Sequence, residues 1–381
     1  MDSEGGRNKN DFFDEVQVWS RIKHRVLDKY LDIYLRKRGS SNPVIFFIDG
    51  FAGKGWYGSG EKVDPGSPIL AARYAQSAIA AGKPYRMQCI FVEADSKRAQ
   101  MLNAAVSEFD PSIVKVIHGP FREWVPSIIQ IIENHPALFF LDPFGVKGIE
   151  LFDIQPLLDR PDTELIVRLD GDYLGRLGGF EDSDAPERES KLRRVSLVLG
   201  EDPNEVNDGW LAQWIRLGEP EAWMDWAINQ YARRLVEQSP YLKYALPYGI
   251  RESYRSRPKY HLIFATRNLG AVALMNDVVC IEDEHLFSTT EIVQKGQSSL
   301  FGDLRDQELE ERLRSLMEEI YSYGIHHQAV TRDHLIEHFA ADKFGLFMKK
   351  HYRKAIGELV KEGRVRFGQG SSKDKSPIYF Q

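Results

Sequence analysis

The 381-residue sequence has only two cysteines, Cys89 and Cys280, each inside an apolar segment. This number excludes a disulfide framework and a cysteine-rich metal site, and no other residues suggest a metal. Long hydrophobic runs are also lacking: the longest, such as 137–141, are far shorter than the ~18 residues that cross a bilayer. The first ten residues are polar and are not followed by the apolar core of a signal peptide. We therefore expect a cytoplasmic protein with free, buried thiols and no membrane contact.

The chain has no overall excess of positive charge. Its formal net charge of −6 argues against a uniformly basic surface for nucleic acid. The charge is uneven, however, because residues 344–381 hold nine Lys and Arg against three Asp and Glu, which leaves −12 for the rest. A basic C-terminal end on an acidic body predicts a module that faces a polyanion.

An α/β pattern dominates the first two thirds of the chain. Residues 12–38 predict an amphipathic helix, because apolar residues recur there at spacings of three and four. Strands then alternate with helices, which predicts a parallel sheet covered by helices on both faces. The predicted strands are 44–48, 86–92, 114–118, 137–141 and 164–169, and the predicted helices are 68–80, 97–109 and 125–134. Residues 260–266 and 271–275 are expected to end the sheet.

A helical insertion rich in tryptophan is predicted at about 173–242. Its tryptophans occur in two pairs, four and three residues apart: Trp210 with Trp214, and Trp223 with Trp226. Packing onto the body is the first interpretation, and a base-stacking or substrate lid is the second. Asp170, just before the insertion, fits a helix-capping turn better than a catalytic site. Four cations follow the insertion, for which solvation is favoured over phosphate contact: Arg251, Arg255, Arg257 and Lys259.

The sharpest motif follows the first predicted strand and has the sequence Asp49-Gly-Phe51-Ala-Gly53-Lys-Gly55. Glycines here let the backbone turn tightly and approach a ligand, because a Cβ would clash. The spacing matches neither the three-glycine dinucleotide fingerprint nor the P-loop. By itself, the loop could be a purely structural turn.

Acidic residues at two further strand ends make a ligand site more specific. Glu93 ends the second strand, where a carboxylate can accept hydrogen bonds from both ribose hydroxyls. Asp95 suits the start of the following helix better. Asp142 ends the fourth strand. Because ligands bind outside the carboxyl ends of parallel strands, we expect Asp49, Glu93 and Asp142 to converge on one nucleoside-bearing ligand.

These motifs resemble those of class I S-adenosylmethionine-dependent methyltransferases: FIDGFAGKG the glycine-rich first motif, FVEAD the acidic second and FLDPFG the fourth. More narrowly, the first 280 or so residues resemble the three-Cys-motif partner protein family (TcmP). The segments that carry this resemblance are KHRVLDKYLDIYL, IDGFAGKGWYGSGEKVDPGSP, FLDPFGVKG and YHLIFATRN. The family takes its name from cysteines of a neighbouring radical-type enzyme.

The resemblance implies S-adenosylmethionine as the cofactor and assigns positions to hold it. Gly53 and Gly55 would approach the methionine part, Asp49 would hold the ammonium group or its surroundings, and Glu93 would hold the ribose. Where methyltransferases often keep an adenine-binding Asp, this chain has His118 and Phe121 nearby. His118 is equally well explained as an ordinary strand-end residue. The predicted cofactor set is completed by the neighbours of these motifs, Phe51 and Ala94.

Asp142, Pro143 and Phe144 are the predicted catalytic residues. The run DPFG is similar to the (N/D)PP(Y/F) motif of exocyclic-amine methyltransferases but lacks the second proline. In that motif the strand-end side chain takes a hydrogen bond from the target amino group, and the aromatic residue stacks on the base. Asp142 could equally be the general base for a hydroxyl group. The methylated atom therefore stays open.

The last 80 residues predict a connector helix at 307–323 and then helix, helix and a β-hairpin wing, which is a winged-helix pattern. Thr331 is expected to cap the first of these helices. The second helix and the wing carry the candidate nucleic-acid contacts, namely Lys349, Lys350, Arg353, Lys354, Arg364 and Arg366. Protein docking is the alternative role for such a module.

The sequence thus predicts three parts: an N-terminal helix at 1–40, a Rossmann-like methyltransferase domain at 41–300 and a basic winged-helix module at 301–381. The favoured function is methylation of DNA or RNA held by the winged helix. The rival is a cofactor-binding partner, without methyl transfer, of a radical SAM enzyme encoded nearby. A nicotinamide-dependent dehydrogenase is disfavoured by the glycine spacing.

Overall fold

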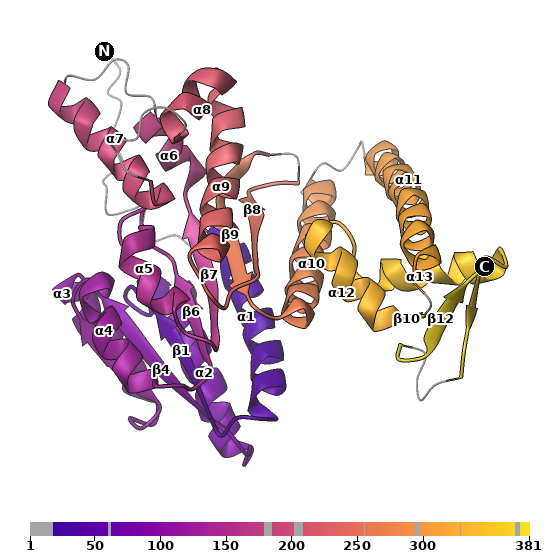
Figure 1. Ribbon diagram of the computed structural model, residues 1–381. Coiled ribbons are helices and arrows are strands. Elements are labelled where there is room, and N and C mark those ends of the chain that lie inside the picture. The colour runs from indigo at the N-terminus through magenta and orange to yellow at the C-terminus, as the bar shows by residue number, and fades with distance from the viewer. Residues whose placement is uncertain are drawn as a thin grey trace. The chain divides into compact units, whose positions relative to one another are not determined.

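The computed structural model describes residues 18–59, 62–178, 185–201, 209–254, 256–293, 298–327, 329–369 and 374–381 (Figure 1). The chain forms two compact units. The first contains the residues up to 252 together with 257–267, and the second contains 253–256 and 268–381. The boundary expected near residue 300 thus falls inside the second unit, which includes helix α10 (Leu269–Val293).

A seven-stranded mixed sheet organises the first unit. Its strand order is β5-β4-β1-β6-β7-β9-β8, in which all neighbours up to β7 are parallel and β9 is antiparallel to both β7 and β8. The sheet is therefore Rossmann-like with an added antiparallel pair. The strands are β1 (Val44–Asp49), β4 (Arg86–Glu93), β5 (Val114–His118), β6 (Ala137–Leu141), β7 (Thr163–Leu169), β8 (Tyr244–Arg251) and β9 (Pro258–Thr266).

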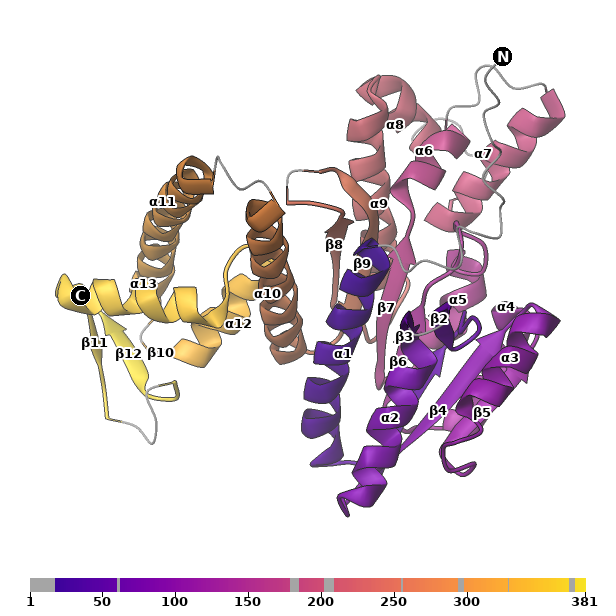
Figure 2. The same cartoon turned by 180° about the vertical axis from the view of Figure 1, so that it is seen from behind.

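The burial of the central strands explains why they could be predicted from the sequence. Every residue of β6 and every residue of β1 after Val44 is buried, because helices cover both faces. Strands in this position need continuous apolar runs rather than alternation. One face is covered by α1 (Val18–Gly39), α2 (Ser67–Ala80) and α3 (Ser96–Val106), and the other by α4 (Phe121–Ile132), α5 (Leu151–Leu158) and α9 (Pro220–Glu237) (Figures 1 and 2).

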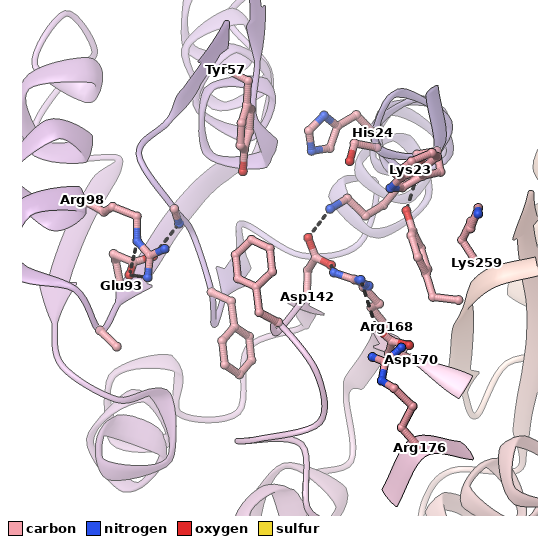
Figure 3. A pocket seen from close by; sticks show the side chains of 17 residues that line it. Lys23, His24, Tyr57, Glu93, Arg98, Asp142, Arg168, Asp170, Arg176 and Lys259 are labelled. Carbon is pink, nitrogen blue, oxygen red and sulfur yellow. Dashed lines mark hydrogen bonds and ion pairs between the residues drawn. The ribbon is translucent and has the colours of Figure 1, made fainter. Parts of the chain in front are cut away.

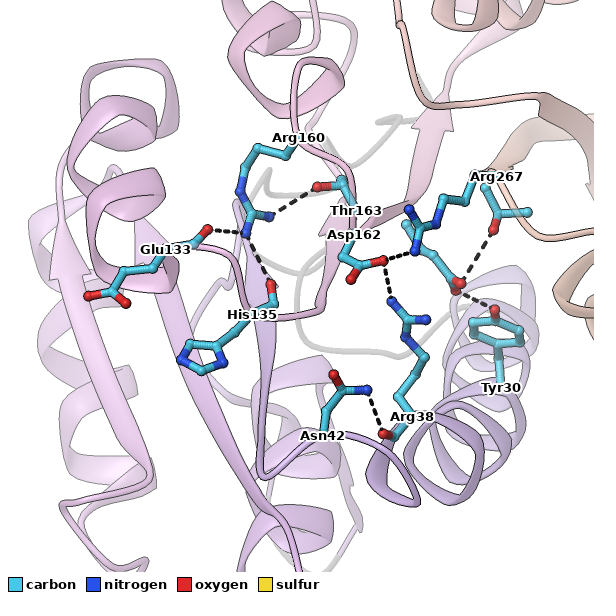
Figure 4. A network of polar contacts seen from close by, with 11 residues as sticks. Tyr30, Arg38, Asn42, Glu133, His135, Arg160, Asp162, Thr163 and Arg267 are labelled. Carbon is cyan, nitrogen blue, oxygen red and sulfur yellow. Dashed lines mark hydrogen bonds and ion pairs between the residues drawn. The ribbon is translucent and has the colours of Figure 1, made fainter.

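Helix α1 is fixed to the sheet by a polar network near its C-terminal end (Figure 4). The hydroxyl of Tyr30 donates to the carboxylate of Glu164, 2.5 Å away, and burial raises the pKa of this carboxyl group. Arg38 donates to Asp162 at 2.9 Å, and Asp162 also pairs with Arg267. Because a buried carboxylate needs such partners, the network ties α1 to a strand more than a hundred residues away.

The helical insertion packs onto the body through its tryptophans. Its helices are α6 (Gly171–Gly178), α7 (Ala185–Leu199), α8 (Trp210–Leu217) and α9. Trp223 is 1% exposed, and the rings of Trp210, Trp214 and Trp226 lie 5.0 to 6.5 Å from it. Edge-to-face contacts of this kind stabilise a core. The packing interpretation is confirmed, because Trp210 and Trp223 belong to the main core and Trp214 and Trp226 pack against it.

One sequence prediction is wrong, and two elements were not predicted. Residues 271–275, expected in the sheet, belong to α10, where buried residues recur at helical spacing. A short apolar run cannot distinguish the two structures. Strand β8 escaped prediction because it contains Pro247, which the sheet tolerates since β8 is its edge. The hairpin formed by β2 (Trp56–Ser59) and β3 (Lys62–Pro65) was also missed.

The second unit begins with two long helices, α10 and α11 (Ser298–Ile325). They are followed by β10 (Val330–Thr331), α12 (Arg332–Asp342), α13 (Lys349–Lys361), β11 (Val365–Phe367) and β12 (Pro377–Phe380), and the strands pair in the order β10-β12-β11. Thr331 caps α12 by accepting a hydrogen bond from the backbone of His334, as predicted. Buried Asn276 of α10 binds backbone groups of Gly345 and Phe347, which explains why α10 belongs to this unit. No helix within the described ranges is long and apolar enough to cross a membrane.

Candidate functional site

A cavity of about 480 Å³ opens beside the carboxyl ends of β1, β4, β6 and β7 (Figure 3). Its walls come from seven parts of the first unit: helix α1, the loop after β1 with the hairpin, the ends of β4 and β6, the first turn of α3, the β7–α6 segment and strand β9. In a sheet of parallel strands such a crevice forms where the strand order reverses. In the order β5-β4-β1-β6-β7 this point lies between β1 and β6. The volume lies within the range of small-molecule sites.

One wall holds the predicted cofactor residues. It consists of Phe51, Gly53, Tyr57, Glu93, Ala94 and Arg98. Gly53 has φ +67°, a conformation that favours glycine, and a Cβ on it would lie 3.1 Å from the hydroxyl of Tyr57. The glycine loop therefore leaves space that a side chain would narrow.

Glu93 connects the other parts of this wall through its hydrogen bonds. It is 5% exposed, and its carboxylate accepts hydrogen bonds from the backbone N–H groups of Gly53 and Asp95, both at 2.8 Å. The guanidinium of Arg98 lies 3.0 Å from the same carboxylate. These contacts join the glycine loop to the end of β4. A polyhydroxyl ligand at Glu93 would exchange with Arg98, a side-chain partner that is 40% exposed, rather than with the two backbone N–H groups.

Asp49 lies beneath the glycine loop and does not line the cavity. It is fully buried; its carboxylate accepts hydrogen bonds from the hydroxyl of Ser67, at 2.6 Å, and from the backbone of Phe51, at 3.0 Å. Gly66 occupies the N-cap position of α2, so the hydroxyl of Ser67, the first helical residue, is used to bind Asp49. Asp49 shapes the loop from below, whereas Glu93 faces the cavity.

Burial raises the pKa of Asp49 to about 7, against hydrogen bonds that lower it. Because the folded-state pKa exceeds the unfolded value, the folded state binds the extra proton between about pH 4 and 7. Stability from this group is therefore full below the unfolded pKa and lost as pH rises toward 7. We expect Asp49→Asn to gain thermal stability relative to the parent protein, by a few kcal/mol, across that interval. Equal pH profiles in calorimetric unfolding would contradict this.

The other predicted cofactor residues take different positions. Gly55 faces α3, where a Cβ would lie 2.9 Å from that of Ala105, so this glycine permits close helix packing. Phe121 is buried against Phe51, with ring centroids 5.8 Å apart. His118 is exposed at the end of β5. None of these three lines the cavity.

The residues of the opposite wall surround Asp142. Its carboxylate forms an ion pair with the ammonium of Lys23 on α1 and lies 3.5 Å from the guanidinium of Arg168. The side chains of Lys23 and Asp142 are only 8% and 14% exposed. One carboxylate oxygen, Oδ1, has no hydrogen-bond partner among the described residues. Asp142 is thus a nearly enclosed carboxylate, and its Oδ1, itself buried, lies 3.5 Å from the guanidinium of Arg168.

The remaining residues of this wall differ in character. They are Trp19, Ser20, His24, Phe144, Asp170, Arg176, Lys259 and Tyr260. Desolvation, together with the charge of Lys23, lowers the pKa of His24 to about 3, so this imidazole is neutral at physiological pH. Asp170 accepts a hydrogen bond from the backbone of Tyr173 and so caps α6, as predicted. Pro143 is buried, whereas Phe144 is 69% exposed at the cavity.

Several lining residues escaped sequence reasoning. Lys23 could have been found, because it stands four residues after Trp19 and four before Leu27, within the apolar stripe of α1. Arg168 is a charge near the end of an apolar strand and gave a similar signal. The rest gave no local signal, since they meet only through the fold: His24, Tyr57, Arg98, Arg176 and Tyr260. Lys259, interpreted as solvated, lines the cavity, Arg257 pairs with Glu221, and Arg255 lies outside the described residues.

The basic residues of the second unit are largely paired with acids of the same unit. Lys350 pairs with Glu284 at 2.8 Å and Arg353 with Asp374 at 2.6 Å. Lys349 lies 3.4 Å from Asp333, and Arg364 binds both Glu318 and Glu362. Lys354 and Arg366 are exposed, and the latter stacks on Tyr379. Residues 268–381 hold 15 Lys and Arg against 18 Asp and Glu, so the unit as a whole is not basic.

No protein-family model and no curated protein matches the sequence. Among solved structures, the chain is similar to yhhF of Escherichia coli, provisionally assigned as a methyltransferase (15% identity, TM-score 0.24, covering 39% of this chain and 70% of that one). It is also similar to a provisional caffeoyl-CoA O-methyltransferase of Staphylococcus aureus (12%, 0.30, 68% and 88%). A third is PKMT2 of Rickettsia typhi (10%, 0.28, 63% and 53%). At these values the comparisons say nothing of what this chain binds.

Proposed function

We propose that the chain is an S-adenosylmethionine-dependent methyltransferase. The observation that carries the proposal is that one cavity receives the glycine loop after β1, Glu93 at the end of β4 and Asp142 at the end of β6. The sheet supports it too. Strand β9 beside β7 is antiparallel, whereas the dinucleotide-binding sheet continues in parallel at this place, which disfavours a dehydrogenase.

The residues of the first wall fit the cofactor. Glu93 offers a carboxylate for the ribose hydroxyls, Gly53 leaves backbone exposed without a Cβ, and Phe51 and Tyr57 offer ring surface. Bound there, the cofactor supplies an activated methyl group on a positively charged sulfur.

Asp142 and its neighbours suit the acceptor. Methyl transfer breaks a carbon–sulfur bond, forms a carbon–nitrogen or carbon–oxygen bond, and releases one proton from the acceptor. Asp142 lies on the wall facing Glu93, so its carboxylate is placed to hold an acceptor N–H or O–H and take that proton. Alignment of donor and acceptor provides much of the rate, because direct transfer needs little covalent help.

We further propose a nucleic-acid acceptor, with the second unit as a winged helix that holds the strand. The order α11-β10-α12-α13-β11-β12 with a three-stranded sheet supports a winged helix. Since Lys349, Lys350, Arg353 and Arg364 have acidic partners, binding would rely mainly on Lys354 and Arg366. We also propose that the protein acts in the cytoplasm and does not bind a membrane.

The second candidate is a partner protein that binds the cofactor without methyl transfer, beside a radical SAM enzyme. One observation favours it: Asp142 is already engaged by Lys23 and lies close to Arg168, an arrangement that holds the carboxylate in an ion pair. A carboxylate that serves as the counter-ion of a nearly buried ammonium has a structural reason to be there without any catalytic role. This candidate shares the cofactor site and differs only in the acceptor step.

Calorimetric titration with S-adenosylmethionine tests the shared part, and a labelled-methyl assay on DNA, RNA and protein tests the rest. We expect a dissociation constant in the micromolar range, about −8 kcal/mol, and label incorporated into nucleic acid. Cofactor binding without incorporation would favour the partner role. A flat titration would refute both.

A further inference from the structure

The cavity carries an excess of positive charge that the cofactor does not explain. Five of its lining residues are Lys or Arg and three are Asp or Glu, in a chain of net charge −6. S-adenosylmethionine brings a positive sulfonium of its own. A positive cavity around a positive cofactor favours a negatively charged third component, because binding sites are complementary in potential to what they hold.

The excess of positive charge lies on the wall around Asp142, which is called the acceptor wall below; the wall around Glu93 is called the cofactor wall. On the cofactor wall, Arg98 is balanced by Glu93. On the acceptor wall four cations face two carboxylates, Asp142 and Asp170 (Figure 3); the cations are Lys23, Arg168, Arg176 and Lys259. The anion to be expected therefore belongs to the methyl acceptor rather than to the cofactor.

Arg168 has hydrogen-bonding capacity that the protein leaves unused. Its Nε is buried and has no hydrogen-bond partner in the described part of the chain. One terminal nitrogen donates a long hydrogen bond to the carbonyl of Pro143, at 3.4 Å, and the terminal nitrogens lie 3.5 Å from Asp142 and 3.6 Å from Asp170. Its guanidinium lies 4.3 Å from the centre of the Tyr260 ring, which fixes its plane. A buried donor without a partner is rare in folded proteins. Arg168 lines the cavity with its side chain 16% exposed, so it is a cation within reach of a ligand there.

Arg176 and Lys259 complete the cluster from the exposed side. Arg176 lies over the ring of Tyr173 at 5.7 Å. Lys259 lies over the ring of Trp19 at 5.6 Å and is 3.8 Å from Glu252, a weak exposed pair. Aromatic surface also borders the cavity, since Phe144 is 69% exposed there. Cations beside exposed rings are the means by which proteins hold phosphate and base together.

We propose that the methyl acceptor is a phosphate-bearing nucleotide unit whose phosphate is held by Arg168, Arg176 and Lys259, with its base toward Phe144 and Asp142. The proposal rests on the proposed function, since it assigns the acceptor of the same site. The nucleotide can be free or part of a strand, because both present the same phosphate and ring.

Binding to the full-length chain tests this, with S-adenosylhomocysteine present at saturation. The probes are labelled single-stranded DNA and RNA of mixed sequence, about 12 nucleotides long, and a mixture of the four pyrimidine and purine ribonucleoside monophosphates as competitor. The variants are Arg176→Ala/Lys259→Ala and, as a matched control, Lys83→Ala in the exposed turn after α2. Competition by the monophosphates would identify a free nucleotide as sufficient; its absence would require a strand.

We expect the double variant to bind about tenfold more weakly or worse, because each substitution removes a charged interaction with phosphate. The slope of log affinity against log salt should fall by about 0.7 for each phosphate of a single strand that is no longer neutralised. Affinity for S-adenosylhomocysteine and the thermal midpoint should match those of Lys83→Ala. Arg176→Lys/Lys259→Arg should recover most of the affinity, since the charge is kept.

Two results would overturn the inference. In the first, Arg176→Ala/Lys259→Ala binds the probes as tightly as the parent, whereas Lys354→Ala/Arg366→Ala loses binding. This would mean that the nucleic acid binds to the second unit alone. In the second, the parent protein binds no probe. Failure of the methyltransferase proposal looks different: S-adenosylhomocysteine would not bind, whereas nucleotide binding and its loss in the double variant would persist.

Discussion

Replacing Glu93 by Ala should weaken S-adenosylmethionine binding about 100-fold or more, since a ribose would lose two hydrogen bonds to a charged group at ~1.5 to 3 kcal/mol each. The carboxylate is 5% exposed and faces the cavity at the end of β4. The fold should survive, because water can reach the N–H groups of Gly53 and Asp95 at the cavity wall once the carboxylate is gone. Calorimetric titration and thermal unfolding measure the two effects separately.

Asp95→Ala is the matched control for this experiment. Asp95 carries the same charge two residues away, is exposed, and caps α3 by accepting from the backbone of Arg98 at 2.8 Å. Its loss should destabilise the fold by about 1 kcal/mol and leave cofactor affinity unchanged. If Glu93→Ala bound the cofactor as well as Asp95→Ala does, the cofactor would not lie against β4.

Replacing Asp142 by Asn should lower kcat by roughly 10² to 10⁴, the range for loss of a proton-accepting group, with cofactor affinity unchanged. Asn keeps the size and one oxygen acceptor but removes the charge. The change also leaves the ammonium of Lys23, whose side chain is 8% exposed, without its anion. We therefore expect a loss of stability of about 3 kcal/mol, typical of breaking a buried pair from one side.

Adding Lys23→Met to Asp142→Asn separates the two roles of this carboxylate. Removing both charges should restore stability, because no unpaired ammonium remains, whereas activity should stay low. Lys23→Met alone would report whether the pair restrains Asp142 as a base. Recovery of methyl transfer in the double variant would show that Asp142 serves only as a counter-ion, and the acceptor proton would then have another destination.

The parallel part of the sheet was determined by sequence alone, because strands covered on both faces must be continuously apolar and are separated by regular helices. The same logic placed the glycine loop, Glu93 and Asp142 at strand ends. Elements with weaker local patterns were missed: β8 is an edge strand with a proline, and 271–275 is apolar in a way that fits either helix or strand.

Tertiary structure decided what each predicted residue does. Asp49 and Glu93 both follow apolar strands, yet one is sealed beneath the loop by Ser67 and the other faces the cavity. The acceptor wall joins Lys23, Arg168 and Lys259, which are separated by more than 90 residues along the chain, so their spacing carries no signal. The basic C-terminal run likewise meets Glu284, Glu318 and Asp333 only in the folded unit. Local patterns set which segments are buried; charge pairing depends on contacts between distant segments, which only the packed chain brings together.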